Sequence, residues 1–239
     1  MKVRLYAIAA TLALLPLSGF TLSKLDGLTV KRQVKEGQIL KLVVKGEFDV
    51  SGQTAELTGK TDEKVTKVSA DDGSYTIEEQ QHDLKAVVGG QDIPINDTPA
   101  ISTVFNADGS IKEILGDATV ASAAAYRLAN LSVVVDSGKP LNVGDTWTYS
   151  IKADPKTGAE AATATYKLVA EEKVGDIDTL KVKATVKETG GSEPASSDGF
   201  YWLDKGDASI VKSELNMSNA PFPNVPPISG KLTLTRVGN

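Results

Sequence analysis

The sequence predicts a mainly β protein in which a duplicated antiparallel meander forms a curved sheet or open barrel with one α-helix against it. Three observations predict this class. Most apolar runs alternate with polar residues at the two-residue period of a half-buried strand. Clusters of glycine, proline, aspartate and asparagine separate these runs and indicate turns. A single alanine-rich segment, residues 117–131, has helical spacing instead.

The first 23 residues have the features of a secretory signal peptide. Lys2 and Arg4 precede an apolar run from Leu5 to Leu17, and small or polar residues follow it. Cleavage after Ser18 or Ser23 leaves a small residue at the cut, and the sequence favours Ser23. Because no cysteine follows, we expect no lipid anchor. The sequence therefore predicts a secreted or periplasmic protein, with residues 24–239 forming a single β-rich domain.

The composition excludes several classes of partner and chemistry. Residues 1–23 contain two of the 26 basic residues and none of the 31 acidic ones, so the remainder has 24 basic and 31 acidic residues, a net charge of −7. This balance argues against nucleic acid and anionic membranes as partners. No later segment approaches the roughly 20 apolar residues of a membrane-spanning helix. The chain has no cysteine, so it forms no disulfide.

The first half of the chain reads as a series of strands. Between Leu40 and Val50, apolar residues alternate with charged ones, as in a strand with one buried face. Residues 54–68 predict one or two further strands, with Leu57, Val65 and Val68 on their core side. The remaining expectations are a strand beginning at Tyr75 and fading over 80–83, a loop over 89–99, and a hairpin of 101–105 with 111–115.

The segment 117–131 is predicted to be the only long helix. Asp117 is a suitable N-cap, and Val120, Ala124, Leu128 and Leu131 recur at helical spacing. Small alanine side chains allow a helix to lie close to a concave sheet. An antiparallel meander of about eight strands must hide its apolar face, and curving around this helix would do so.

The second half opens at Pro140, where a turn at Gly144 and Asp145 starts a strand containing Trp147 and Tyr149. A hairpin turn at 154–158 follows. Further strands are expected at 162–168, 180–186, 200–203 and 210–217, and a last one passes through Leu232 and Leu234. A polar loop is expected at 188–199 and a proline-rich loop at 219–227.

The two halves, about 28–116 and 140–239, resemble each other in outline. Each passes from a glycine-led strand through a polar hairpin to a similar turn, which is DGSI at 108–111 and DASI at 207–210. We therefore expect a duplicated unit, with the helix connecting the two copies.

The stretch LNVGDTW, which follows Lys139-Pro140, resembles an uncharacterised family of secreted bacterial β proteins in which a Pro-x-x-x-Gly-Asp-x-Trp turn opens the second half. The resemblance covers roughly 110–217 and includes FYWLDKGDASIVKSE. More distantly, the expected strand order and helix placement are similar to those of the periplasmic lipoprotein-carrier (LolA-like) proteins. That resemblance implies a concave sheet that holds acyl chains.

The sequence offers little for catalysis. His82 is the only histidine, so a multi-histidine metal site is excluded by count, and we expect no histidine-based triad. The segments 106–110 and 204–207 are similar to short parts of calcium loops. They lack the glycine at the sixth position and the bidentate glutamate at the twelfth position that such a loop requires. Adjacent glutamates such as Glu171 and Glu172 point to opposite faces of a strand. We therefore expect no enzyme, no catalytic residue, no metal site and no cofactor.

Aromatic and apolar residues are the remaining candidates for binding. Trp147 and Trp202 could line an apolar pocket or belong to the core. Phe222 and Val225 lie in a proline-rich loop that either presents them to a ligand or packs them on the sheet rim. The sequence thus leaves two functions open: a protein that binds a lipid or other apolar small molecule in a concave sheet, or a structural module that binds an envelope protein.

Overall fold

The structure is a computed structural model that describes residues 27–50, 52–95, 99–222 and 226–238. The predicted signal peptide, residues 1–23, lies outside the described residues. The helix and strands of the described part follow in chain order: β1 (Ile39–Val50), β2 (Gln53–Val68), β3 (Tyr75–Val88), β4 (Gln91–Ile93), β5 (Ile101–Phe105), β6 (Ile111–Leu115), α1 (Ala123–Leu131), β7 (Thr146–Ile151), β8 (Ala162–Val174), β9 (Ile177–Glu188), β10 (Ser196–Asp204), β11 (Ile210–Ala220) and β12 (Ile228–Arg236).

The strands form one antiparallel sheet of 12 strands that is not closed. Its order is β6-β5-β3-β2-β1-β12-β11-β10-β9-β8-β7, and the short β4 pairs with β3. Two consecutive meanders therefore meet where β1 pairs with β12, and β6 and β7 are the two edges. The predicted fold class, a curved meander with one helix, is confirmed, although with 12 strands rather than about eight. The relation of the halves by duplication stays a prediction.

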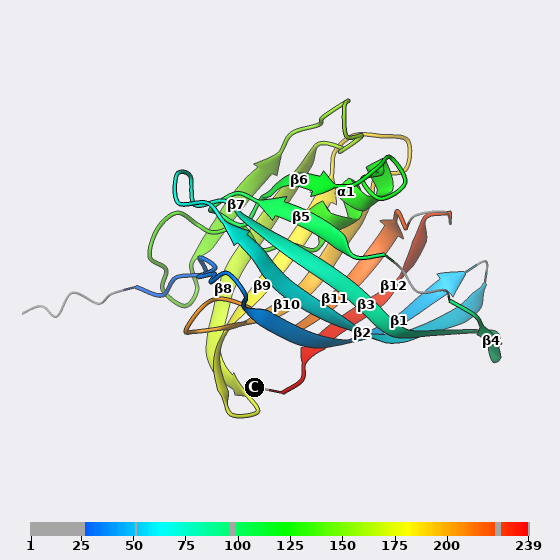
Figure 1. Cartoon of the computed structure of the whole chain (residues 1–239), viewed down its shortest axis with the longest axis horizontal. Helices are drawn as coiled ribbons and strands as arrows, with labels where there is room; N and C mark the ends of the chain where they lie inside the picture. The colour runs from blue at the N-terminus through cyan, green and yellow to red at the C-terminus, as the bar shows by residue number, and fades with distance from the viewer. Residues whose placement is uncertain (1–26, 51, 96–98, 223–225, 239) are drawn as a thin grey trace, which may run out of the picture.

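The sheet curves strongly, so that β2 and β3 cross in front of β9, β10 and β11 (Figure 1). Glycines on the concave face permit close approach of backbone and side chains. A Cβ atom at Gly199 would lie 1.9 Å from the carbonyl oxygen of Glu214, and one at Gly230 would lie 2.2 Å from that of Glu47. Only glycine fits these positions without movement of the neighbouring strand.

The concave face is covered near β7 to β11 by three segments. These are α1, the residues 132–135 that follow it, and an N-terminal strap, residues 28–38. The strap is held along its length by backbone hydrogen bonds of 2.8 to 2.9 Å to Leu141, Asp207 and Val65. Its Val30 joins the main core, and its Val34 joins a smaller cluster around Tyr75. The strap therefore fills one end of the curved sheet.

The helix begins later than the sequence predicts. Its N-cap is Ser122, whose hydroxyl accepts from the backbone N–H of Ala125 at 3.3 Å. The expected cap, Asp117, instead accepts from the backbone N–H groups of Thr119 and Val120 at 2.9 and 3.3 Å. An aspartate that bonds its own following backbone forms a local turn, which competes with helix nucleation.

Several strands differ from their predicted bounds. β2 is a single strand of 16 residues, and β3 continues to Val88 instead of fading at 83. A bulge with Asp83 at φ 54° shifts the alternation within β3, so the apolar side chains after it do not continue the earlier pattern. β4 lies inside the predicted loop at 89–99, and β10 begins at Ser196 inside the predicted polar segment.

Candidate functional site

The concave face carries an accessible apolar surface on β12, β1, β2, β3 and β4. Directly paired residues of antiparallel strands lie on the same face, so the strand register groups side chains into rows. One row consists of Leu232, Gly46, Leu57, Ala86 and Ile93, and the next of Gly230, Phe48, Ala55 and Val88. We call this surface the trough and define it by Ala55, Leu57, Leu84, Ala86, Val88, Ile93, Leu232 and Leu234.

The trough is the part of the apolar concave face that α1 leaves uncovered. Ile93 is 45% exposed, and the other trough side chains are half-buried. The same row continues through β11 to β7 as Leu215, Gly199, Ala184, Tyr166 and Trp147, where every non-glycine residue is 8% exposed or less. The β1–β2 hairpin and β4 extend beyond α1 (Figure 1). The two halves of one row thus differ because α1, the residues that follow it and the strap cover only one of them.

Glycines shape the floor of the trough. The Phe48 ring lies over Gly46, where a Cβ atom would be 2.4 Å from a ring carbon. Leu84 lies over Gly59 in the same way, because its Cδ2 atom would be 2.5 Å from a Cβ atom at Gly59. Both glycines belong to the concave face, since they pair with Leu57 and Val44 respectively. Their missing side chains let larger apolar groups lie flat on the backbone.

Toward the strap, the concave face becomes polar. Thr61 pairs with Gln81, and Glu63 pairs with Glu79 in the following row. The guanidinium Nη2 of Arg32, on the strap, lies 3.5 Å from Oε2 of Glu63. Burial, together with the nearby charge of Glu63, raises the pKa of Glu79 to about 7, against the opposing effect of Arg32. The inner end of the trough is therefore a cluster of two carboxyl groups and one guanidinium.

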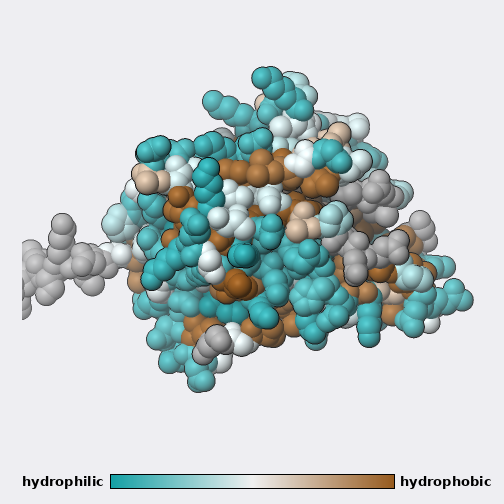
Figure 2. Space-filling model, viewed as in Figure 1, coloured by the Kyte–Doolittle hydropathy of each residue, from teal (hydrophilic) through white to brown (hydrophobic). Residues whose placement is uncertain are grey.

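A slot of about 150 Å³ lies at the seam between the edge strands β6 and β7. Apolar and aromatic residues line it, including Tyr126, Val133 and Ile151. Two hydrogen bonds connect the edge strands to α1 and to the residues after it. The Tyr126 hydroxyl accepts from the backbone N–H of Ile114 in β6 at 2.9 Å, and Trp147 Nε1 in β7 donates to the carbonyl of Val135 at 2.8 Å. Figure 2 shows hydrophobic residues at the surface beside β6 and α1.

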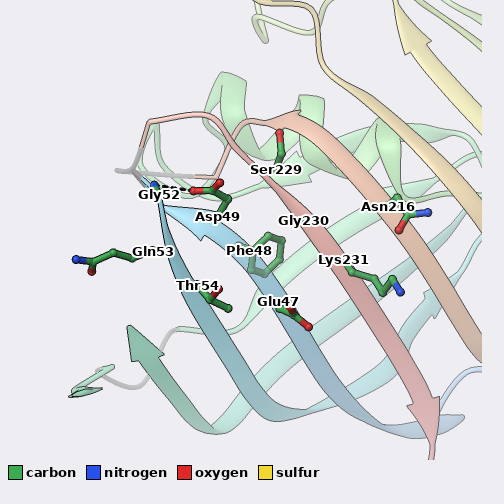
Figure 3. A pocket seen from close by; sticks show the side chains of 10 residues that line it. All are labelled: Glu47, Phe48, Asp49, Gly52, Gln53, Thr54, Asn216, Ser229, Gly230 and Lys231. Carbon is green, nitrogen blue, oxygen red and sulfur yellow. Dashed lines mark hydrogen bonds between the residues drawn. The ribbon is translucent and has the colours of Figure 1, made fainter. Parts of the chain in front are cut away.

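A larger groove of about 470 Å³ lies on the opposite face of the sheet. Figure 3 shows the side chains of Glu47, Asn216 and Lys231 around it, from β1, β11 and β12. These three occupy one row, since Lys231 pairs with both others. The groove is open and mostly polar, and Glu47 and Asp49 are the carboxylates that line it. Among the described residues, no group of three His, Asp or Glu side chains could hold a metal ion.

The four residues predicted to bind a ligand do not converge. Trp147 is buried in the core and stacks on Tyr166. Trp202 lies on the opposite, convex face, between the ammonium groups of Lys181 and Lys212 at 4.8 and 4.7 Å from its ring. Phe222 packs on the core and meets the Phe48 ring edge-on at 5.3 Å, beside the trough. Val225 lies outside the described residues.

The sequence reasoning missed most of the trough. Leu57 was expected on a core face, but Ile93 fell within a predicted loop. The alternation of Leu84, Ala86 and Val88 is the signal that could have been used, since it resumes a strand pattern after the bulge.

No family model matches the sequence, and no curated protein matches it. Among solved structures, the chain is similar to part of lipovitellin in a study of its lipid–protein interactions, with a TM-score of 0.46 and 13% identity over 86% of this chain; it spans about a quarter (26%) of the lipovitellin chain. It is also similar to a Bacteroides fragilis protein described as exported, with a YmcC-like fold, at a TM-score of 0.35 and 14% identity over 89% of this chain and 100% of the other. A Parabacteroides distasonis protein described as a lipoprotein is similar with a TM-score of 0.37 and 13% identity, over 88% of this chain and 98% of the other.

These likenesses concern the arrangement of strands alone, and the expected resemblance to exported bacterial β proteins goes no further than this. In the described part of the chain, α1 has nine residues, and no helix has the length and apolar character needed to cross a membrane.

Proposed function

We propose that this is a non-enzymatic secreted or periplasmic protein that holds an apolar or amphiphilic ligand in the trough. The observation that carries the proposal is the uncovered half of the apolar rows, including Leu57, Ala86 and the 45% exposed Ile93. Covering such a surface contributes about 25 cal/mol for each Å² removed from water. A contiguous exposed apolar surface commonly marks a binding site.

The non-enzymatic character rests on the sequence. The absence of cysteine leaves no thiol nucleophile, and the single histidine, His82, leaves no multi-histidine metal site. The secreted or periplasmic location rests on the predicted signal peptide at 1–23.

One observation favours a second function, that of a structural module that binds an envelope protein. The half of the concave face near β7 to β11 is completely filled, with Leu168 and Val182 both 0% exposed. In that case the trough residues would be the exposed edge of the same apolar core and would bind no ligand.

A matched pair of variants separates the two functions. Leu57→Asp places a charge in the trough, whereas Thr58→Asp places the same charge one residue away on the opposite, exposed face. Uptake of the apolar fluorophore N-phenyl-1-naphthylamine is measured for both variants and the native protein. We expect Leu57→Asp to weaken uptake about tenfold or more, because a charge in an apolar site costs well over 1.4 kcal/mol. Thr58→Asp should bind like the native protein. No uptake by the native protein, with no lipid seen by native mass spectrometry, would favour the module.

A further inference from the structure

The inner end of the trough contains a carboxyl group without a partner. Glu79 pairs in register with Glu63 on β2 and Ile101 on β5, so its side chain lies on the concave face. It is half-buried. Among the described residues, no side chain or backbone group forms a hydrogen bond or an ion pair with its carboxyl group. A partly buried carboxyl group is normally paired, so Glu79 has binding capacity that the protein does not use.

The charges around Glu79 leave this end of the trough acidic. Glu63 lies beside it on β2, and Arg32 approaches from the strap. β5 contributes the uncharged Ile101, Thr103 and Phe105 on this face. Arg32 Nε and Glu63 Oε2 are both buried and have no hydrogen-bond partner. Two carboxyl groups thus face one guanidinium, and two of the cluster's polar atoms remain unsatisfied.

The cluster is continuous with the apolar surface. From Glu79 to Ala86, the concave side of β3 passes through Gln81 and Leu84. Seven residues of strand span roughly 23 Å, so an extended amphiphile with its polar end at Glu79 lies along Leu84 and extends toward Ala86. An alkyl chain lying on Leu84, Ala86 and Leu57 would therefore bring its polar end to Glu79.

Resting on the proposed function, we infer that the trough selects amphiphiles whose polar group is a cationic ammonium, which donates to Glu79, over amphiphiles that carry an acid. A carboxylate head group at this point would meet Glu63 and Glu79, whose like charges repel it. An ammonium group would supply the missing donor and neutralise the excess negative charge. A charge-assisted hydrogen bond of this kind contributes about 1.5 kcal/mol or more, which is about tenfold in affinity.

The test compares three ligands with the same alkyl chain: dodecylammonium, dodecanol and dodecanoate. Their affinities are measured by isothermal titration calorimetry at pH 8, below micelle formation. We expect dodecylammonium to bind about tenfold or more tightly than dodecanoate. Glu79→Gln should remove this preference and change dodecanol binding much less, because the glutamine amide oxygen still accepts from a hydroxyl group. Glu78→Gln is the matched control, because Glu78 is the neighbouring residue on the opposite face of β3, and it should keep the preference.

The outcomes distinguish this inference from the proposed function. Binding of dodecanol without any preference for the ammonium, or a preference that survives Glu79→Gln, overturns the inference and leaves the trough as an apolar binding site. Failure of all three ligands to bind the native protein removes both.

Discussion

Glu79 also makes the stability of the ligand-free protein depend on pH. Its pKa in the folded protein is about 7, raised from the ordinary 4.5, mainly by burial and then by Glu63, with Arg32 acting in the opposite direction. The folded state therefore binds this proton more tightly than the unfolded state does. Stability is greatest while Glu79 is protonated and falls as the pH rises from about 4.5 to about 7.

The corresponding variant is Glu79→Gln, which cannot ionise. We expect the free energy of unfolding of the native protein to fall between pH 4.5 and 7, relative to that of Glu79→Gln, by up to about 3 kcal/mol. Urea unfolding at several pH values measures this difference. The free energy of unfolding of Glu78→Gln should depend on pH as that of the native protein does. If the native and Glu79→Gln proteins showed the same pH dependence, Glu79 would not have a raised pKa.

Gly199 tests how tightly neighbouring strands pack on the concave face. A methyl group there would lie 1.9 Å from the Glu214 carbonyl oxygen, which belongs to the backbone and cannot rotate away. We expect Gly199→Ala to lower the free energy of unfolding by about 2 kcal/mol or more. Gly206→Ala is the control, since its Cβ would come no closer than 3.3 Å to one side-chain oxygen of Asp204. Equal effects of both substitutions in denaturant unfolding would show that the sheet relaxes freely at Gly199.

At the scale of elements, a buried ion pair joins α1 to β9. Arg127 donates from Nε and Nη2 to the two carboxylate oxygens of Glu188 at 2.8 and 2.7 Å, and Glu188 also accepts from the Ala195 backbone at 2.6 Å. The Glu188 side chain is only 3% exposed. Removal of the arginine would leave this carboxylate buried without its counter-charge.

We therefore expect Arg127→Met to destabilise the protein by about 3 kcal/mol or more, as loss of one partner from a buried pair does. Lys173→Met breaks an exposed ion pair, since the side chains of Lys173 and Asp178 are 65% and 66% exposed. It should lower the free energy of unfolding by less than about 1 kcal/mol. Guanidinium unfolding of both variants measures the difference. A small effect of Arg127→Met would mean that the other contacts of α1, such as the hydrogen bond between Tyr126 and Ile114, are enough to hold it.

Local patterns predicted most elements but not their full extent. The alternation in 40–50, 101–105 and 111–115 matches β1, β5 and β6 closely. β3 was cut short because the bulge at Asp83 changes which residues face inward, and a period-two pattern does not survive that shift. The predicted helix begins too early, at Asp117. An aspartate forms an N-cap and a local turn with the same hydrogen bonds, and only the backbone path distinguishes the two.

At the scale of the whole molecule, the sequence predicted a curved sheet with one helix but not its site. The trough depends on the pairing of β1 with β12, strands about 190 residues apart, which no local pattern reports. The sequence also grouped Trp147 with Trp202, whose strands place them on opposite faces once the register is known. A candidate site on a sheet can be assigned only after the concave face has been identified.

The β1–β12 pairing also joins the two meanders into one continuous sheet. We expect residues 24–239 to unfold as a single domain, with one calorimetric transition whose measured and van't Hoff enthalpies agree. Two separated transitions would instead mean that the meanders are independent units.

The most direct test of the trough is a titration with dodecanol followed by the methyl NMR signals of the protein. Dodecanol is uncharged, so the result does not depend on a charge interaction with Glu79. We expect saturable shifts for Leu57, Leu84, Val88 and Ile93, which line the trough, and unchanged signals for Leu168, which is 0% exposed beneath the covered half. Shifts confined to residues of the seam slot, such as Val133 and Ile151, or no shifts at all, would contradict the assignment of the trough as the ligand site.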